Sequence, residues 1–303
     1  MLYMRILPIV MVLFSLGLQA CSNPSSSSPP VLADIHETTF AEQSIRAGNL
    51  GGLYISAGDN TPITLIVPGS GAVDLNGNIG ANMRTNAYKY LAQQLAAKSV
   101  SSVRVDKRGL HSSAKAGNPN AVTVDIYAQD YRNWIDTIKQ KTGAKCVYLL
   151  GHSEGGLMVS RAAIGRSDVC GLILVSAPGR PLGTVLREQI KSNPANFLIR
   201  KQAFAAITKL EAGEKVNTEN MNPALLGLFR DSVQDYWISL MAVDPAQVAA
   251  QAKKKTLIVQ GGNDFQVSVK DAELLAEATG GELVVLGKVN HILKMPQRIG
   301  AAI

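Results

Sequence analysis

A serine set between glycines is the first feature of the sequence that suggests chemistry. Gly151-His152-Ser153-Glu154-Gly155 follows a short apolar run at residues 147–150 and precedes a helix-forming stretch. At a strand–turn–helix corner, such glycines allow the sharp turn, and the serine hydroxyl is presented above the sheet. We therefore predict that Ser153 is a nucleophile.

A serine nucleophile needs a base, and the chain has four histidines. His291 lies in the loop after the apolar run 283–286, and active sites assemble in the loops that follow parallel strands. His36 lies before the strong strand patterns. His111 follows a strand end and could face the mouth of the site. His152 is adjacent to Ser153, and the tight turn should direct its ring away from that serine. We predict His291 as the base.

An acid must orient the histidine ring, and Asp264 is our candidate. It follows the apolar run 256–259 through Gln-Gly-Gly-Asn, and the glycines allow the chain to turn there. Asp244 and Asp271 compete less well, because the first precedes a proline outside a strand end and the second belongs to a helical pattern. The alternative role for Asp264 is a helix N-cap ahead of Val267.

Acyl transfer also requires backbone N–H groups that receive the negative charge of the carbonyl oxygen. The amide of Glu154, directly after the nucleophile, is one expected donor. A second should come from the loop after the apolar run 63–67, where Gly69-Ser70-Gly71 allows a close backbone approach. Ser70 is our preferred donor in that loop, and Gly71 is the alternative.

The elements that must position these residues alternate between strand and helix patterns. Short apolar runs separated by helices indicate a mostly parallel sheet covered on both faces. We predict strands at residues 38–41, 50–56, 63–67, 100–105, 147–150, 172–175, 256–259 and 283–286, and helices at residues 85–98, 126–138, 156–164 and 269–278.

The strand signal is absent from residues 179–255, where helical segments appear at 185–191, 197–210, 223–229 and 232–241. We expect a helical cap of this extent, inserted between the sixth and seventh core strands. Phe229, Trp237 and Met241 are candidates for the pocket wall, and packing within the cap is their alternative.

Composition supports one large globular domain over residues 36–303. The chain has 303 residues, is 46% hydrophobic and 17% charged, and shows no composition break at its middle. The net charge of +7 does not indicate nucleic acid binding, because the basic residues are scattered.

The amino terminus has the outline of an export signal. Residues 1–20 combine Arg5 with a short apolar stretch, and the Leu-Gln-Ala-Cys run ending at Cys21 resembles the lipobox of bacterial lipoproteins. That resemblance implies that Cys21 carries the lipid anchor and that the protein is attached to a bacterial membrane, with the outer membrane favoured if the organism has one. The Ser/Pro composition after the cysteine predicts a flexible tether at residues 21–35. An ordinary signal peptide is the alternative.

Export changes how Cys146 and Cys170 are interpreted, since secreted proteins form disulfides. Each cysteine opens an apolar run, so neighbouring parallel strands would place both at the same sheet end. The sequence leaves two alternatives for this pair, a disulfide bond or two buried free thiols. No histidine is near enough in sequence to suggest a zinc site, and we predict no metal.

Together these motifs resemble the α/β-hydrolase superfamily, and more narrowly bacterial esterases related to the serine aminopeptidase group. The resemblance is carried in order by VPGSG, VDKRG, LGHSEGG, SVQDYWISLMAVDPA, VQGGNDFQVSVKDAELLA and VNHILK. It implies the triad Ser153, Asp264 and His291, activity on short-chain carboxylic esters, and no cofactor. Such relatives normally add a final helix, whereas this sequence ends twelve residues after His291, so both a natural shortening and a fragment remain open.

The leading functional prediction is a serine carboxylesterase that takes a small ester. An aminopeptidase acting on exported peptides is the second, for which Glu211, Glu214, Asp231 and Asp235 could bind an amino terminus. A lipoprotein scaffold without activity is the third.

Overall fold

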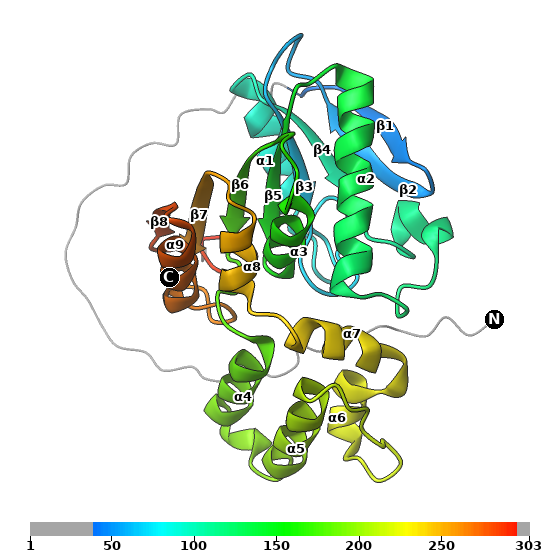
Figure 1. Cartoon of the computed structure of the whole chain (residues 1–303), viewed down its shortest axis with the longest axis vertical. Helices are drawn as coiled ribbons and strands as arrows, with labels where there is room; N and C mark the ends of the chain where they lie inside the picture. Colours follow the sequence, from blue (N-terminus) through cyan, green and yellow to red (C-terminus); the bar gives the residue numbers. More distant parts are fainter. Residues whose placement is uncertain (1–38, 296–303) are drawn as a thin grey trace, which may run out of the picture.

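The computed structural model describes residues 39–295 and contains one eight-stranded sheet (Figure 1). The spatial order of the strands is β1-β2-β4-β3-β5-β6-β7-β8. The first two strands pair antiparallel, β2 also runs antiparallel to β4, and all other neighbours are parallel. The strands are β1 (Glu42–Ala47), β2 (Leu50–Ile55), β3 (Ile63–Val67), β4 (Ser101–Val105), β5 (Val147–His152), β6 (Val169–Val175), β7 (Thr256–Gly261) and β8 (Glu282–Leu286).

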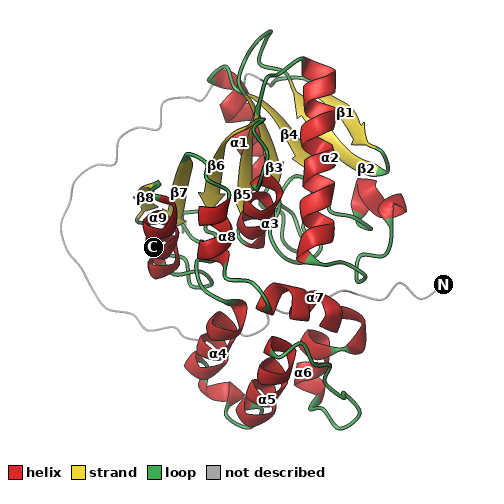
Figure 2. Ribbon diagram, viewed as in Figure 1, coloured by secondary structure: helices red, strands yellow, loops and turns green. Residues whose placement is uncertain are grey.

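Helices cover the sheet, and several of them lie in the long chain segment that connects β6 to β7 (Figure 2). The α-helices are α1 (Ala87–Ala97), α2 (Val124–Thr142), α3 (Glu154–Ala163), α4 (Leu182–Ser192), α5 (Arg200–Glu211), α6 (Pro223–Phe229), α7 (Asp231–Met241), α8 (Pro245–Gln251) and α9 (Val269–Thr279). Short 3₁₀ helices occupy η2 (His111–Ala116) and η3 (Pro194–Asn196). The predicted α/β class with a mostly parallel sheet and helices on both faces is confirmed.

The continuous apolar runs of the central strands serve two cores at once. Leu65 and Leu149 pack in the core beneath α2, α3, α8 and α9, whereas the adjacent Ile66 and Leu150 pack on the opposite face with Tyr88 of α1. Consecutive strand residues point to opposite faces, so a strand covered on both sides must be apolar at every position. This is why these strands could be found from the sequence.

Residues 39–41 of the leading strand predicted at 38–41 are not in a strand, so that prediction was wrong over the residues that the structure describes. The first strand in the described residues is β1, in which Ile45 and Ala47 are buried at alternate positions. β1 pairs with β2 across a tight connection at Gly48, whose φ of 60° favours glycine. The period-two pattern that defines a strand therefore begins later than we expected.

Four helices form a group of their own, which we call the helical insertion and define as α4 to α7. They pack around an apolar centre that includes Ile207, Leu210 and Phe229, and Figure 1 shows them apart from the sheet. Helix α8, which the sequence did not reveal, instead joins the sheet core through Val248 and Ala249. Within the predicted cap span of 179–255, the separate group of helices therefore ends with α7.

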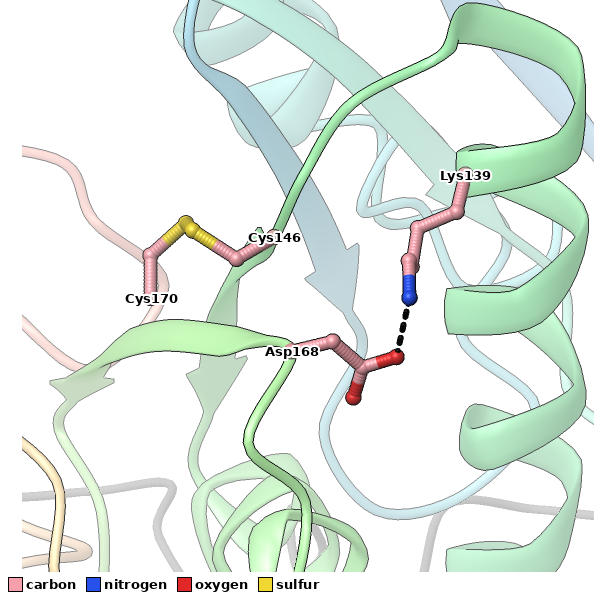
Figure 3. The surroundings of a disulfide bond; sticks show 4 residues. All are labelled: Lys139, Cys146, Asp168 and Cys170. Carbon is pink, nitrogen blue, oxygen red and sulfur yellow. Dashed lines mark hydrogen bonds and ion pairs between the residues drawn. A yellow bond between two sulfur atoms is a disulfide. The ribbon is translucent and has the colours of Figure 1, made fainter.

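Cys146 and Cys170 form a disulfide at the amino ends of β5 and β6 (Figure 3). Their Cα atoms are 5.2 Å apart. Val147 pairs with Val169 and Tyr148 pairs with Gly171, so Cys170 is an additional residue at a bulge. A bulge redirects the side chain that it carries, and here it gives Cys170 a different orientation from that of regular strand pairing. Figure 3 also shows Lys139 of α2, which bonds to Asp168 beside the bridge at 2.6 Å.

The predicted signal peptide, Cys21, the tether and His36 lie outside the described residues. Within residues 39–295, no helix combines the length and the apolar character required to span a membrane.

Candidate active site

Ser153 lies at a strained corner between β5 and α3. Its backbone has φ 54° and ψ −128°, in a region that L-residues rarely adopt and that costs about 1–3 kcal/mol. A Cβ added at Gly151 would collide with the carbonyl of Gly155, and one added at Gly155 would lie 2.7 Å from the carbonyl oxygen of Pro68. The two glycines of the motif therefore allow the corner to form, and the corner presents Ser153 at the carboxyl end of the sheet.

The structure brings the three predicted triad residues into one line of hydrogen bonds. The Ser153 hydroxyl donates to Nε2 of His291 at 3.0 Å. Nδ1 of His291 donates to Oδ2 of Asp264 at 2.8 Å. Since β5, β6, β7 and β8 are parallel neighbours, the loops that follow them converge at one sheet edge.

Asp264 uses its two carboxylate oxygens for different purposes. Oδ1 accepts the N–H groups of Gln266 and Val267, each at 2.9 Å, while Oδ2 accepts His291 and Nε2 of Gln260. Burial raises the pKa of Asp264, but the hydrogen bond and charge of His291 and the two backbone donors hold that pKa below its usual value. The carboxylate is therefore charged at neutral pH and held rigidly.

The alternative roles considered for these aspartates are also decided. Ser268, not Asp264, is the N-cap of α9, and Asp271 completes its capping box. Asp271 also pairs with Arg180 at 2.9 Å, and Asp244 caps α8. The N-cap interpretation of Asp264 was wrong, because its Oδ1 closes a turn that ends before the helix begins.

The loop after β3 lies directly against the nucleophile. A Cβ added at Gly69 would be 3.0 Å from the Cβ of Ser153. The Ser70 hydroxyl donates to Oε2 of Glu154 at 2.9 Å, which links this loop to the first turn of α3. The amide of Glu154 begins α3, where the first N–H groups have no partner within the helix. Both predicted sources of oxyanion donors thus adjoin Ser153, and Gly71 sits in the same loop with φ 78°.

Two buried side chains that we did not predict hold Gly69 from both sides. Lys107 donates to the Gly69 carbonyl at 2.7 Å, and the Tyr88 hydroxyl accepts the Gly69 N–H at 3.4 Å. Burial lowers the pKa of Lys107, while the nearby charge of Glu154 opposes this. The position of Lys107 just past a strand end, in VDKRG, was the only sequence signal for it. Tyr88 gave none, since its helical spacing indicates core packing.

His152 behaves as expected toward the nucleophile but has a contact that we did not foresee. Neither ring nitrogen bonds to Ser153: Nδ1 is 2.8 Å from the Tyr88 hydroxyl, and Nε2 is 2.8 Å from the carbonyl oxygen of His291. The ring is buried, and its only sequence signal was its place beside the serine.

A mostly apolar pocket of about 320 Å³ opens over Ser153 between the sheet and the helical insertion. Trp237 lines it and also donates Nε1–H to the Leu228 carbonyl at 2.6 Å. Phe229 and Met241 are buried in the core of the insertion, so packing within the cap is the correct interpretation for these two side chains. Apolar side chains contributed by the insertion are Leu182, Val185, Leu186, Leu228, Val233, Trp237 and Leu240.

Comparison with known protein families identifies the family of this chain. The model of the family described as serine aminopeptidase, S33, matches residues 79–293, most of the chain, and this range includes the three predicted triad residues. The chain belongs to this serine aminopeptidase family, within the α/β-hydrolases.

The individual proteins to which the chain is similar share less than a third of their aligned residues with it. Esterase EstD of Thermotoga maritima is 29% identical over 262 residues, covering 84% of this chain. The chain spans about 60% of the length of that relative. Among solved structures, Est1E from Butyrivibrio proteoclasticus has 16% identity and a TM-score of 0.54, with 84% of this chain and 91% of that one covered. The α/β-hydrolase GrgF from Penicillium sp. sh18 has 20% identity and a TM-score of 0.56, with 83% and 90% covered. These two structures support the fold.

The acidic residues expected to bind an amino terminus do not line the pocket of this family member. Glu211 pairs with Arg187 at 2.6 Å, and Asp235 pairs with Lys215 at 2.9 Å. Asp231 accepts the Thr218 hydroxyl, and Glu214 is exposed. The pocket carboxylate in the described chain is Glu154, which already accepts Ser70.

His111 also lies outside the pocket lining. It begins η2, and its Nε2 donates to the Ala72 carbonyl at 3.1 Å. Across residues 39–295, no cluster of three or more His, Cys, Asp or Glu side chains is placed to hold a metal ion.

Proposed function

We propose that the protein is a serine carboxylesterase that cleaves short-chain esters through an acyl-enzyme. The observation that carries the proposal is the line of hydrogen bonds Ser153–His291–Asp264, 3.0 and 2.8 Å long, at the floor of an apolar pocket. A hydroxyl bonded to an imidazole that is itself oriented by a buried carboxylate is an activated nucleophile. The similarity to an esterase supports the same class of reaction.

In the first half of the reaction, Nε2 of His291 takes the Ser153 proton as Oγ bonds to the ester carbonyl carbon. The electron pair of the carbonyl moves to its oxygen, which accepts the N–H groups of Glu154 and of Ser70 or Gly71. The imidazolium then gives its proton to the departing alkoxide, which leaves as an alcohol. Asp264 holds the ring orientation and stabilises the positive charge.

In the second half, the acyl group on Ser153 is hydrolysed by water. His291 takes one water proton as the hydroxide oxygen attacks the acyl carbon, and it returns that proton to Ser153 Oγ when the ester bond to the serine breaks. The acid is released and the enzyme is restored. The developing negative charge uses the same backbone donors in both halves.

The pocket favours an ester over a peptide with a free amino terminus. Its wall from the helical insertion is mostly apolar and includes the cationic side chain of Arg230. The four acidic residues that would recognise an ammonium group are engaged or exposed elsewhere. Glu154, the carboxylate among the described lining residues, already accepts the Ser70 hydroxyl, so an ammonium group buried there would recover little of its lost hydration.

The test compares the chain with Ser153→Ala, His291→Ala and Asp264→Ala on p-nitrophenyl acetate, butyrate and decanoate. We expect turnover favouring the shorter esters, and a fall of about 10⁶-fold in kcat for Ser153→Ala. Aminoacyl anilides, assayed in parallel, would turn over faster if the peptidase alternative holds. A folded protein that hydrolyses neither substrate and resists fluorophosphonate labelling would be a scaffold.

We further propose that the protein is exported and anchored to a bacterial membrane, preferably the outer membrane, by a lipid on Cys21. The charged and apolar start of the sequence and its Leu-Gln-Ala-Cys run support this, as does the Cys146–Cys170 disulfide, which suits an oxidising compartment. In a bacterial host supplied with labelled palmitate, the full chain should take up label and sediment with membranes. Cys21→Ala should do neither, and labelling of that variant would exclude the anchor.

A further inference from the structure

A buried tyrosine and histidine join the two loops on which the proposed reaction depends. Tyr88 on α1 and His152 at the end of β5 are 3% and 6% exposed. The Tyr88 hydroxyl contacts the N–H of Gly69 in the oxyanion loop, and Nε2 of His152 contacts the backbone carbonyl of His291. Between them, Tyr88 and His152 are hydrogen-bonded to each other at 2.8 Å.

The partners leave one arrangement of protons along this chain. A carbonyl oxygen only accepts, so Nε2 of His152 must carry the hydrogen that bonds to His291. In a neutral ring Nδ1 is then an acceptor, and it takes the Tyr88 hydroxyl proton. The Tyr88 oxygen remains free to accept the Gly69 N–H. Every group is satisfied with both side chains uncharged.

Burial keeps the histidine in that neutral form. Desolvation lowers the pKa of His152 to about 3, and the neighbouring His291 adds to this, while the bond to the His291 carbonyl and the charge of Asp264 oppose it. The groups that face the ring are Tyr88 from α1, His291 from the loop after β8, and Asp264 from the loop after β7. Because its pKa is lowered so far, His152 is a neutral link between Tyr88 and the His291 carbonyl at neutral pH.

We propose that Tyr88 and His152 are positioning residues. They hold the loop after β3, which contains Gly69 and the expected oxyanion donors, at a fixed distance from the loop after β8, which carries His291, with Ser153 between them. The inference rests on the proposed esterase function and adds residues to it. The His291 carbonyl is anchored by His152, so the imidazole of His291 is held from its backbone as well as through Asp264. A displacement of about 1 Å at a reacting group costs roughly 100-fold in rate.

Four substitutions separate the two bonds of His152 from each other and from simple packing. His152→Gln places an amide N–H near the position of Nε2 and retains the bond to His291, whereas His152→Asn reaches only the position of Nδ1. His152→Leu removes both bonds, and Tyr88→Phe removes the hydroxyl alone. Tyr148→Phe on β5, where the tyrosine is 38% exposed, is the matched control.

We expect His152→Leu and His152→Asn to lower kcat by about 10- to 100-fold with KM changed by less than about 3-fold. His152→Gln should recover most of the loss, and Tyr88→Phe should lose less than His152→Leu because the bond to His291 remains. The rate of fluorophosphonate labelling of Ser153 should follow kcat. A folded His152→Leu that keeps kcat within about twofold of the original, or a Gln variant no better than Leu, would overturn the inference.

A spectroscopic readout separates this inference from the proposed function. In protein labelled with ¹⁵N at histidine, His152 should show the Nε2–H tautomer and should not titrate between about pH 8 and 4. If the original chain lacks turnover and labelling, the esterase proposal fails while this measurement still decides the protonation of the link. Titration of His152 within that range would refute the neutral link even in an active enzyme.

Discussion

Among single residues, Asp264 has contacts that explain why a carboxylate is needed at this position. One oxygen closes the turn to Gln266 and Val267, and the other holds Nδ1 of His291. An asparagine keeps an acceptor for the turn but lacks the negative charge that stabilises imidazolium and selects its tautomer.

We therefore expect Asp264→Asn to lower kcat by about 10³- to 10⁴-fold while the melting temperature changes little. The measurement is steady-state hydrolysis of p-nitrophenyl butyrate beside a thermal melt. Asp244→Ala, which removes the N-cap side chain of α8, is the control that should melt earlier yet keep its kcat. Full activity of Asp264→Asn would remove this residue from the site.

The residues of the proposed triad were accessible to sequence reasoning because each follows a strand in a short, distinctive segment. Ser153 lies in a glycine-bounded corner, and His291 and Asp264 lie in loops after apolar runs. Gln260 and Tyr88 had no comparable signal. Their side chains matter through contacts with Asp264 and His152, which the local sequence of a strand or helix does not encode.

At the scale of elements, the disulfide joins β5 to β6 and closes a loop with a sequence separation of 24 residues. Because such a link restricts the unfolded chain, replacing both cysteines by serine should cost about 3 kcal/mol. For a domain of this size, that corresponds to a fall of about 5–10 °C in Tm. Calorimetry of the oxidised protein, the reduced protein and the double variant tests this; equal Tm values in all three would show that the bridge does not stabilise the fold.

The ion pair between Arg180 and Asp271 connects the chain after β6 to α9 and predicts a pH dependence of stability. Burial raises the pKa of Asp271, but Arg180, the Ser268 hydroxyl and the Gly179 N–H hold that pKa below its usual value. The unfolded chain then binds the proton more tightly, so this stabilisation is complete above about pH 4 and is lost as the pH falls through the lower folded pKa.

Asp271→Asn should therefore destabilise the protein by about 3 kcal/mol at neutral pH, because it leaves Arg180 without its buried partner. The same variant should lose less stability than the original chain between about pH 5 and 3. Urea unfolding across that range is the measurement. Asp125→Asn, which alters an exposed pair with Arg161, should leave the pH dependence unchanged, and an unaltered acid transition in Asp271→Asn would contradict the argument.

At the scale of the whole molecule, substrate size depends on the space between the sheet and the helical insertion. Val233 on α7 lines the pocket, whereas Asp235 on the same helix faces solvent. A tryptophan in place of Val233 would occupy pocket volume, whereas a tryptophan in place of Asp235 would not.

Val233→Trp should thus raise the ratio of kcat/KM for p-nitrophenyl butyrate over decanoate by about 10-fold or more, since each lost methylene contact is worth about 1 kcal/mol. Asp235→Trp should leave that ratio unchanged. A similar ratio in both variants would indicate that the acyl chain binds outside this pocket.

The alternation of strands and helices, the glycine corner at Ser153, and the loops that carry Asp264 and His291 could all be predicted from the amino-acid sequence. These features follow from neighbours along the chain, since residue spacing decides which side chains share a face and glycine permits the turn. The residues that the helical insertion contributes to the pocket, and the side chains that support the proposed triad, depend instead on how distant parts of the chain pack together. The bond between Tyr88 and His152 joins residues 64 apart, and that between His152 and His291 joins residues 139 apart. Such contacts exist because β3 lies beside β5 and the later strands add in order to the same edge, an arrangement set by the packing of the whole sheet.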